Sequence, residues 1–325
     1  MKIKYAEQIT LTNIEKDEYD LIIASSGYES RATCLVEKLK NQSKSRKIYI
    51  GFKERKEEKQ RKINDGKFLE LGFVKHDIEA GEGNFEDIIG ILDNIFTDFL
   101  KRKELNVFVD YSCMTKVWYS TIINYFSFKH SVLESLQISF GYTPAKYSKP
   151  KEPMPNQYMG PIPGVYRISA SNKPIVLVIG LGYEKYRAKG LVEHIDPEKT
   201  FVFYSKPAFD EKYVTDIEQN NSDLLVNLDS QNIHCHPVND LISTESQLTS
   251  LYHALRDDYK IILAPQGPKP FALLCILLAH RYPDIDIWRV SAGGSRKVYD
   301  REPSLLDPII CKVVFENVKT KELAV

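Results

Sequence analysis

Two short polar segments of this 325-residue chain combine the residue types that bind or process charged ligands. Each follows an apolar run. The residues concerned are Ser25, Ser26, Gly27, Tyr28, Glu29 and Arg31 in the first segment, and Asp110, Ser112, Cys113, Thr115 and Lys116 in the second. Arginine forks, lysine charges and hydroxyl groups are the side chains that recognise phosphate. The two segments are therefore the first candidates for chemistry.

Both segments recur, in the same order, in the second half of the chain. The first reappears as Gly-Tyr-Glu, an arginine and the run Leu-Val-Glu, and the second as a shorter segment that ends in a lysine. The counterparts are Gly182, Tyr183, Glu184 and Arg187 in the first motif, and Gly267 and Lys269 in the second. Two motifs that recur in one order predict an internal duplication.

The elements around these segments alternate between apolar runs of strand length and helical patterns. The predicted strands are 20–25, 47–52, 106–111 and 136–140 in the first half, and 175–180, 200–205, 259–264 and 285–290 in the second. Helices are expected at 117–128 and 270–281. This alternation is typical of βαβ units with a parallel sheet. It predicts an α/β fold with two tandem Rossmann-like, doubly wound domains related by internal duplication.

A proline-rich stretch separates the two repeats. We expect a first domain at 1–143, a linker at 144–172 and a second domain at 173–325. Prolines and lysines in the linker resist regular structure, although 165–169 has the pattern of a short strand.

The two polar segments are expected to meet at one edge of each sheet. In a doubly wound sheet, ligands lie beyond the carboxyl ends of the strands, where the strand order reverses. With the order 3-2-1-4-5, that crevice lies between the first and fourth strands, which deliver the two segments. The helices that follow would add amide donors and a positive dipole end, which favour anions. We therefore predict a site for a phosphate-bearing ligand.

Structural roles compete with this interpretation. Gly27 and Gly182 would suit a tight turn equally well. Glu29 would also pair with Arg31 across one turn of helix. The halves differ too, because prolines flank Gly267 in the second half and proline lacks an amide donor. We therefore favour a site that is composite or lies mainly in the first half.

Composition narrows the class of protein. The 44 Lys and Arg balance 44 Asp and Glu, so the chain lacks the basic face of a general DNA or RNA binder. No apolar run reaches the ~20 residues of a membrane helix. The five cysteines are scattered, which indicates a reducing cytoplasm. The run 234–236, His-Cys-His, has the pattern of a strand, and no GxGxxG motif is present. We expect neither a metal nor a cofactor.

The segment from Val109 to Lys116, Val-Asp-Tyr-Ser-Cys-Met-Thr-Lys before an apolar helix, resembles the Thr-x-Gly-Thr-Lys loop of CRISPR-associated Rossmann-fold (CARF) sensor domains. Two such units in one chain look like the fused arrangement of the SAVED sensors. The resemblance implies recognition of cyclic or linear oligonucleotide second messengers in antiviral defence. The implied ligand contacts are Ser112, Thr115 and Lys116, with Lys269 as their counterpart. Met114 departs from the pattern, since the CARF loop has glycine there.

Three functions stay open. The first, which we favour, is a sensor for a phosphate-bearing nucleotide or cyclic oligonucleotide that acts through a separate effector protein. The second is a nucleotide hydrolase, such as a phosphodiesterase, ring nuclease or nucleoside-bond hydrolase. Its catalytic candidates are Glu29 as general acid or base, Asp110 as acid or orienting group, Cys113 as nucleophile, and Lys116 with Arg31 as charge-stabilising groups. The third is a scaffold whose repeat forms a pseudo-twofold interface, which leaves a homodimer open.

Overall fold

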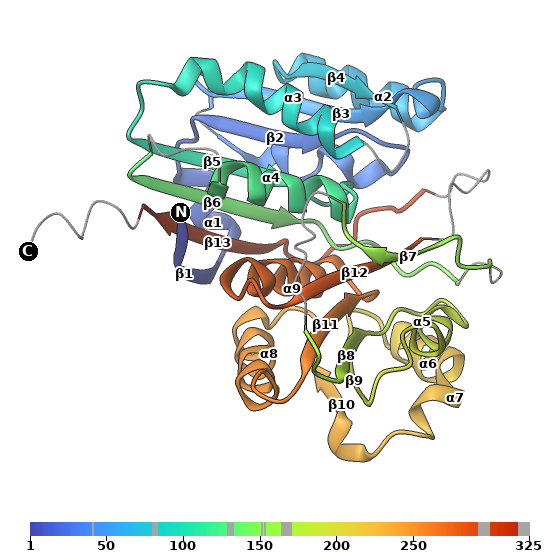
Figure 1. Ribbon diagram of the computed structural model, residues 1–325. Helices are drawn as coiled ribbons and strands as arrows, with labels where there is room; N and C mark the ends of the chain where they lie inside the picture. Colours follow the sequence, from blue (N-terminus) through green and yellow to red (C-terminus); the bar gives the residue numbers. More distant parts are fainter. Residues whose placement is uncertain are drawn as a thin grey trace, which may run out of the picture. The chain divides into compact units, whose positions relative to one another are not determined.

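The computed structural model describes residues 1–40, 42–79, 84–128, 133–150, 152, 154–163, 171–291 and 300–317. The chain divides into two compact units. The first is formed by Met1–Lys146 and Val298–Val325, and the second by Tyr147–Lys297. Each unit combines helices with one mainly parallel sheet (Figure 1), and the predicted class of two Rossmann-like α/β domains is confirmed.

The first unit is built on a seven-stranded sheet with the order β1-β13-β6-β5-β2-β3-β4. Its strands are β1 (Lys2–Ile9), β2 (Leu21–Ser25), β3 (Arg46–Phe52), β4 (Val74–Ile78), β5 (Glu104–Asp110), β6 (Ser135–Tyr142) and β13 (Ile309–Glu316). The strands β4-β3-β2-β5-β6 run parallel in the expected order 3-2-1-4-5. β13 pairs antiparallel with β6 on one side and with β1 on the other.

Helices cover both faces of this sheet because its central strands are apolar on both sides. They are α1 (Leu11–Lys16), α2 (Lys59–Glu70), α3 (Asn84–Phe96) and α4 (Lys116–Phe128). α3 and α4 pack together on one face (Figure 1). On the other face, Ile14 of α1 and Phe68 of α2 share a core cluster with Tyr49 and Phe108 of the sheet. The helix predicted at 117–128 is thereby confirmed.

The segment after β2 differs from the α-helix that we expected there. Ser30–Thr33 and Val36–Lys38 form two short 3-10 helices instead. Every residue of 31–36 except Cys34 is buried, so the segment has no solvent-exposed face and winds tightly into the core. The loop after β2 therefore lacks the long helix, and the helix dipole, that we expected behind it.

The second unit repeats the same topology on a six-stranded sheet with the order β10-β9-β8-β11-β12-β7. Its strands are β7 (Tyr158–Pro161), β8 (Ile175–Gly180), β9 (Lys199–Ser205), β10 (Ile233–His236), β11 (Lys260–Pro265) and β12 (Asp286–Ser291). Its helices are α5 (Arg187–Ile195), α6 (Glu211–Asn220), α7 (Ser222–Leu225), α8 (Leu241–Leu255) and α9 (Lys269–Arg281). The strands β10-β9-β8-β11-β12 are again parallel in the order 3-2-1-4-5. The shared order agrees with the predicted duplication.

The C-terminal segment departs from the boundaries drawn from the sequence. We placed all of 173–325 in the second domain, but β13 pairs with β6 along its whole length in the first sheet. Ile310, Val313 and Phe315 of β13 are buried there, so an apolar strand completes the first core. The second unit is therefore inserted between β6 and β13. The predicted linker contains β7 of the second sheet, and the strand expected at 165–169 lies outside the described residues.

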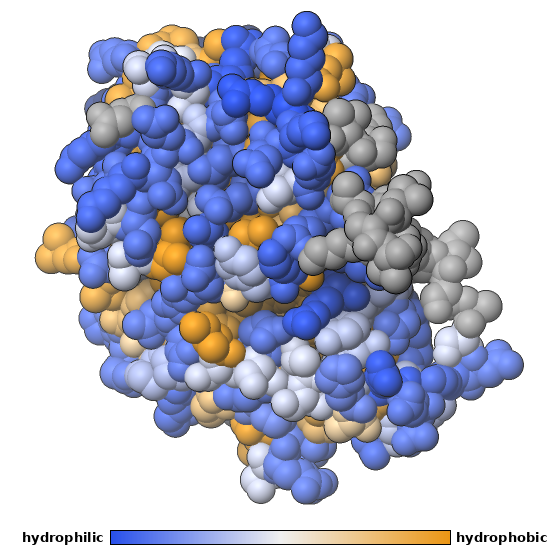
Figure 2. All heavy atoms as spheres, turned by 90° about the vertical axis from the view of Figure 1, so that its left-hand side faces the viewer, coloured by the Kyte–Doolittle hydropathy of each residue, from blue (hydrophilic) through white to orange (hydrophobic). Residues whose placement is uncertain are grey.

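The surface adds two observations. Within the described part of the chain, every helix is too short or too polar to cross a bilayer. Figure 2 shows one face of the molecule, on which hydrophilic side chains predominate and apolar ones form small separate patches.

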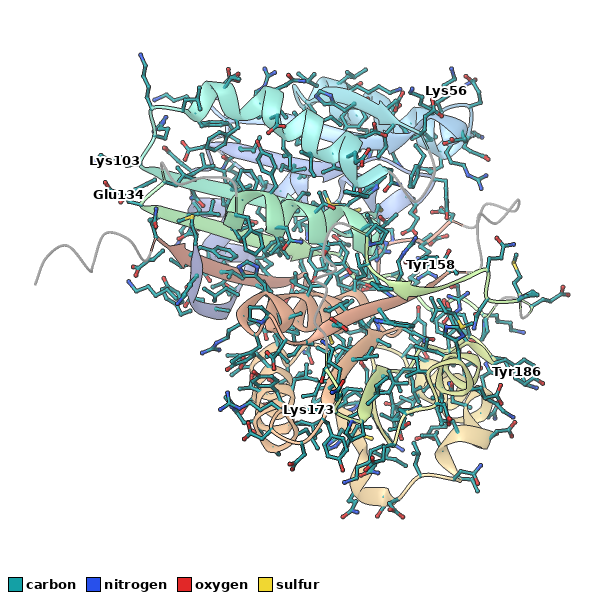
Figure 3. All side chains as sticks on the ribbon, viewed as in Figure 1. Lys56, Lys103, Glu134, Tyr158, Lys173 and Tyr186 are labelled. Atoms are coloured by element: carbon teal, nitrogen blue, oxygen red, sulfur yellow. The ribbon has the colours of Figure 1, made fainter. Side chains whose placement is uncertain are left out.

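Figure 3 labels Lys103 and Glu134, which precede β5 and β6 and form an ion pair of 2.7 Å. They mark the amino-terminal edge of the first sheet, opposite to the edge that carries the polar loops.

Candidate ligand site at the carboxyl ends of the strands

The loop after β2 is fastened by two neighbouring residues of α2. Asn64 Nδ2 donates to the main-chain oxygens of Gly27 and Glu29, at 2.8 Å each. Ser26 Oγ donates to Asp65 Oδ1 at 2.5 Å. These contacts fix the loop at the carboxyl end of β2, where the strand order predicts the crevice.

Asp65 also anchors a network of ion pairs beneath this loop. Arg61 Nε and Lys75 Nζ donate to its two carboxylate oxygens, at 2.6 and 2.8 Å. A second guanidinium nitrogen of Arg61 donates to Asp77 Oδ1 at 2.6 Å. Burial alone would raise the pKa of the Asp65 carboxyl, but hydrogen bonds from Arg61, Lys75 and Ser26 outweigh it and lower the pKa. Asp65 therefore stays ionised and holds the Ser26 hydroxyl.

The Arg31 side chain is buried and links neighbouring segments of the protein, whereas we expected an exposed guanidinium. Its side chain is 1% exposed, and its Nε donates to Glu29 Oε2 at 2.7 Å. Its two terminal nitrogens donate to the main-chain oxygens of Thr143 and Ser112, at 2.6 and 3.1 Å. We expected Arg31 to face a ligand, but its donors bind protein oxygens. The pairing with Glu29 matches the structural role that the sequence left open.

The loop after β5 lies on the other side of this cross-link. Asp110 ends β5, is 1% exposed, and accepts a hydrogen bond from the Ser112 amide at 3.0 Å. Ser112 is fully buried, and its Oγ accepts from the Thr143 amide at 2.8 Å. Both side chains therefore shape the loop and the start of the chain that leaves β6.

The end of this loop presents the groups best placed for an anion. Thr115 Oγ1 accepts from the Trp118 amide at 3.4 Å and so contributes to capping α4. Lys116 is the first residue of this 13-residue helix and is partly exposed. Met114, the departure from the CARF pattern, is 1% exposed and belongs to the core. The helix start thus combines a lysine charge with the positive end of a helix dipole.

Glu29 contacts the cysteine of this second loop. Cys113 Sγ donates to Glu29 Oε2 over 3.7 Å. Tyr28, beside Glu29, has its pKa raised mainly by burial and next by the Glu29 charge. The Cys113–Glu29 contact therefore joins the two loops, as the Arg31–Ser112 hydrogen bond does.

The glycines of the two units occupy different surroundings. A Cβ placed on Gly27 would have no atom of the described residues within 4 Å, whereas one on Gly182 would lie 2.8 Å from the main-chain oxygen of Gln266. One on Gly267 would lie 2.8 Å from the oxygen of Leu181. None of the three has a positive φ. The two loops of the second unit thus touch through their glycines, while the first unit leaves open space at Gly27.

The second unit holds its Gly-Tyr-Glu loop with asparagines as well. Asn220 Nδ2 donates to the oxygen of Tyr183 at 2.7 Å, and Asn221 Nδ2 to that of Gly182 at 3.0 Å. They follow the second parallel strand of their sheet, as Asn64 does in the first unit. These asparagines were not among the predicted site residues, because their spacing from the preceding strand differs between the two halves.

The other predicted residues of the second unit make mostly internal contacts. The Tyr183 ring packs on that of Tyr213, with centroids 5.5 Å apart. Arg187, the first residue of α5, pairs with Glu184 of the preceding loop over 3.8 Å. Lys269 is the first residue of α9, as Lys116 is of α4. The lysine at the helix start is therefore the feature that both strand-four loops retain.

The histidines of β10 serve the core. His234 and His236 stack on the rings of Phe203 and Phe271, with centroids 4.6 and 5.5 Å apart. Burial lowers the pKa of both imidazoles. Among the described residues, no three His, Cys, Asp or Glu side chains are grouped so as to hold a metal ion.

No protein-family model matches the chain, and no curated protein matches it significantly. Function must therefore be argued from the site itself.

Proposed function

We propose that the protein binds a phosphate-bearing nucleotide or oligonucleotide at the carboxyl edge of the first sheet and acts as a sensor for it. The observation that carries this proposal is the space at Gly27, in the loop after β2, which the described residues leave open. Neither packing nor a positive φ requires glycine there. A residue without a side chain lets a ligand approach the main chain closely.

The polar groups of the loops after β2 and β5 suit a phosphate. Lys116 supplies a charge at the start of α4, and the α4 amides add the positive end of a helix dipole. Arg31 and Asn64 hold the loop after β2 in place, and Arg31 joins it to the loop after β5. A loop that is already fixed loses little freedom when a ligand binds, which favours affinity.

The first unit is the better candidate of the two. In the second unit, the contacts of Gly182 with Gln266 and of Gly267 with Leu181 narrow the equivalent space. Lys269 is retained at the start of α9, so the second unit would offer a ligand a positive charge but less room beside the main chain than the first unit does. This asymmetry supports a site that lies mainly in the first half.

A sensor fits the site better than a hydrolase does. Glu29 is paired with Arg31, and Asp110 accepts the Ser112 amide, so both candidate carboxylates already hold the loops. We extend the proposal to a separate effector protein in antiviral defence, as the resemblance to CARF and SAVED sensors implies.

The test is a melting-temperature screen followed by analysis of the ligand. Cyclic di-, tri-, tetra- and hexanucleotides and linear dinucleotides are added to the purified chain. We expect at least one to stabilise the fold, since a ligand at 100 times its Kd adds about 2.7 kcal/mol. Chromatography should recover that nucleotide intact, whereas turnover would favour the hydrolase.

A matched pair of variants ties the effect to the site. Gly27→Leu should fill the open space and abolish the shift without unfolding the protein. Gly90→Leu places the same side chain at an equally open glycine of α3 and should keep the shift. A shift that survives Gly27→Leu, or a wild-type chain that responds to no nucleotide, would overturn the proposal.

A further inference from the structure

The loop that carries Gly27 is bordered by chain from the far end of the sequence. The Ser30 amide donates to Asp300 Oδ1 at 2.6 Å, across 270 positions of sequence. Arg301, the next residue, has its Nε 4.0 Å from Glu29 Oε1. These residues lie in the part of the first unit that follows the inserted second unit. The segment was not among the residues that the sequence motifs pointed to.

Main-chain contacts hold this returning segment in a defined place. Ala145 and Pro303 form an antiparallel β-bridge. On either side of it, the Lys146 amide donates to the oxygen of Glu302, and the Ser304 amide to that of Pro144, at 2.9 Å each. Arg301 therefore stands between two anchors, the Asp300 side chain and this short pairing. Because the main chain is held on both sides of Arg301, its side chain is positioned before a ligand binds.

The two arginines near Glu29 differ in their exposure. Arg31 is 1% exposed and lies 2.7 Å from the Glu29 carboxylate, which balances its charge. The Arg301 side chain is 36% exposed and forms a longer ion pair, of 4.0 Å, with the same carboxylate. Burial raises the pKa of Tyr28, and Arg301 is among the charges that oppose this rise. Arg301 therefore brings a partly exposed guanidinium to the loop that carries Gly27.

We propose that Arg301 binds the phosphate group of the ligand at the Gly27–Glu29 loop, and that Asp300 is its positioning residue. A guanidinium offers phosphate two parallel hydrogen bonds, which a lysine cannot match. The inference rests on the proposed nucleotide site. Arg31 is buried and its donors bind protein oxygens, so Arg301 is the arginine that we assign to the phosphate. It also makes the site depend on chain beyond the second unit.

The experiment measures binding of inorganic pyrophosphate and of AMP by calorimetry, with adenosine as the counterpart without phosphate. Arg301→Gln is compared with Arg102→Gln, an exposed arginine at the amino-terminal edge of the first sheet. We expect Arg301→Gln to weaken pyrophosphate and AMP by about tenfold to a hundredfold, as loss of a charged hydrogen bond would. Arg102→Gln should leave both unchanged, and Arg301→Lys should keep part of the affinity.

Asp300 provides a second measurement that a purely structural role would not reproduce. Asp300→Asn keeps an acceptor for the Ser30 amide and removes a negative charge, so pyrophosphate affinity should hold or rise. Asp300→Ala removes the anchor and should lower that affinity several-fold. Equal losses in both variants would contradict the positioning role.

The outcomes distinguish a failure of the Arg301 role from a failure of the proposed nucleotide-binding function. If a nucleotide of the screen stabilises the chain but Arg301→Gln binds pyrophosphate and AMP as the wild type does, the inference alone fails. It also fails alone if the wild type responds to that nucleotide but binds neither pyrophosphate nor AMP. If no nucleotide stabilises the wild type, the proposed function fails with it.

Discussion

The guanidinium of Arg31 donates to the main-chain oxygen of Ser112 at 3.1 Å, across 81 positions of sequence. The two residues belong to the loops after β2 and β5, which are the loops that flank the reversal of strand order in the first sheet. Because Arg31 also bonds Glu29 and Thr143, one buried side chain joins three segments at this edge. The geometry of the proposed site therefore depends on a residue that we do not expect to touch the ligand.

Replacing Arg31 should strongly destabilise the first unit. Arg31→Ala leaves Glu29 without its buried partner and two main-chain oxygens without donors, and such losses cost about 3–5 kcal/mol. Lys103→Ala, which breaks the exposed pair with Glu134, should cost less than about 1 kcal/mol. Urea unfolding followed by hydrogen exchange of the first unit measures both. Comparable effects of the two substitutions would refute the cross-link.

The glycines of the two units should respond in opposite ways to alanine. Gly182→Ala sets a methyl group 2.8 Å from the main-chain oxygen of Gln266, and overpacking of this kind costs about 1–3 kcal/mol. Gly27→Ala meets no atom of the described part of the chain within 4 Å and should be neutral or stabilising by up to about 1 kcal/mol. Thermal unfolding of the two variants decides the matter. A destabilised Gly27→Ala would mean that the open space is absent.

Removal of the asparagine of α2 should loosen the loop without disturbing the core. Asn64→Ala deletes two hydrogen bonds to Gly27 and Glu29, each worth about 0.5–1.5 kcal/mol. We expect faster amide exchange at 27–30, weaker nucleotide binding, and unchanged exchange in β5. Asn94→Ala in α3 serves as a control on the same unit. Unchanged amide exchange at 27–30 would contradict the role of Asn64 in holding this loop.

Acid should weaken the second unit through its buried histidines. Burial holds the pKa of His236, and of His234, below the ordinary value of 6.5. The unfolded chain therefore binds more protons than the folded one between the folded pKa and 6.5. Stability contributed by the neutral rings is present above pH 6.5 and is lost as the pH falls through that window. His236→Gln should flatten this loss between about pH 7.5 and about pH 5.5, and His253→Gln, an exposed control on α8, should not. An identical pH profile for wild type and His236→Gln would contradict the assignment.

The fold was predictable where the signal was local. Apolar runs of strand length, repeated motifs and a lysine before each apolar helix predicted the duplication and the place of Lys116 and Lys269. The role of Arg31 was not predictable, because an arginine two residues after glutamate has the same local pattern whether it is buried or exposed. Its burial depends on Ser112 and Thr143, which lie 81 and 112 positions away.

The C-terminal part was the least predictable for a related reason. β13 has no counterpart in the repeat, and its partners β6 and β1 are chosen by pairing across the whole chain. The same pairing brings Asp300 back to Ser30. No motif spacing encodes contacts of this kind, so the residues that we propose as part of the site emerged only from the folded chain.

The position of β13 also sets an order for events at the ribosome. Translation delivers the whole of the second unit before it delivers the strand that lies between β6 and β1. Until that strand emerges, β6 ends the nascent sheet with unpaired main-chain groups, and β1 has no neighbour in it. Such an edge is a site for pairing with other chains. Synthesis that stalls before residue 309 would therefore leave an aggregation-prone intermediate, in which the second unit is free to fold first.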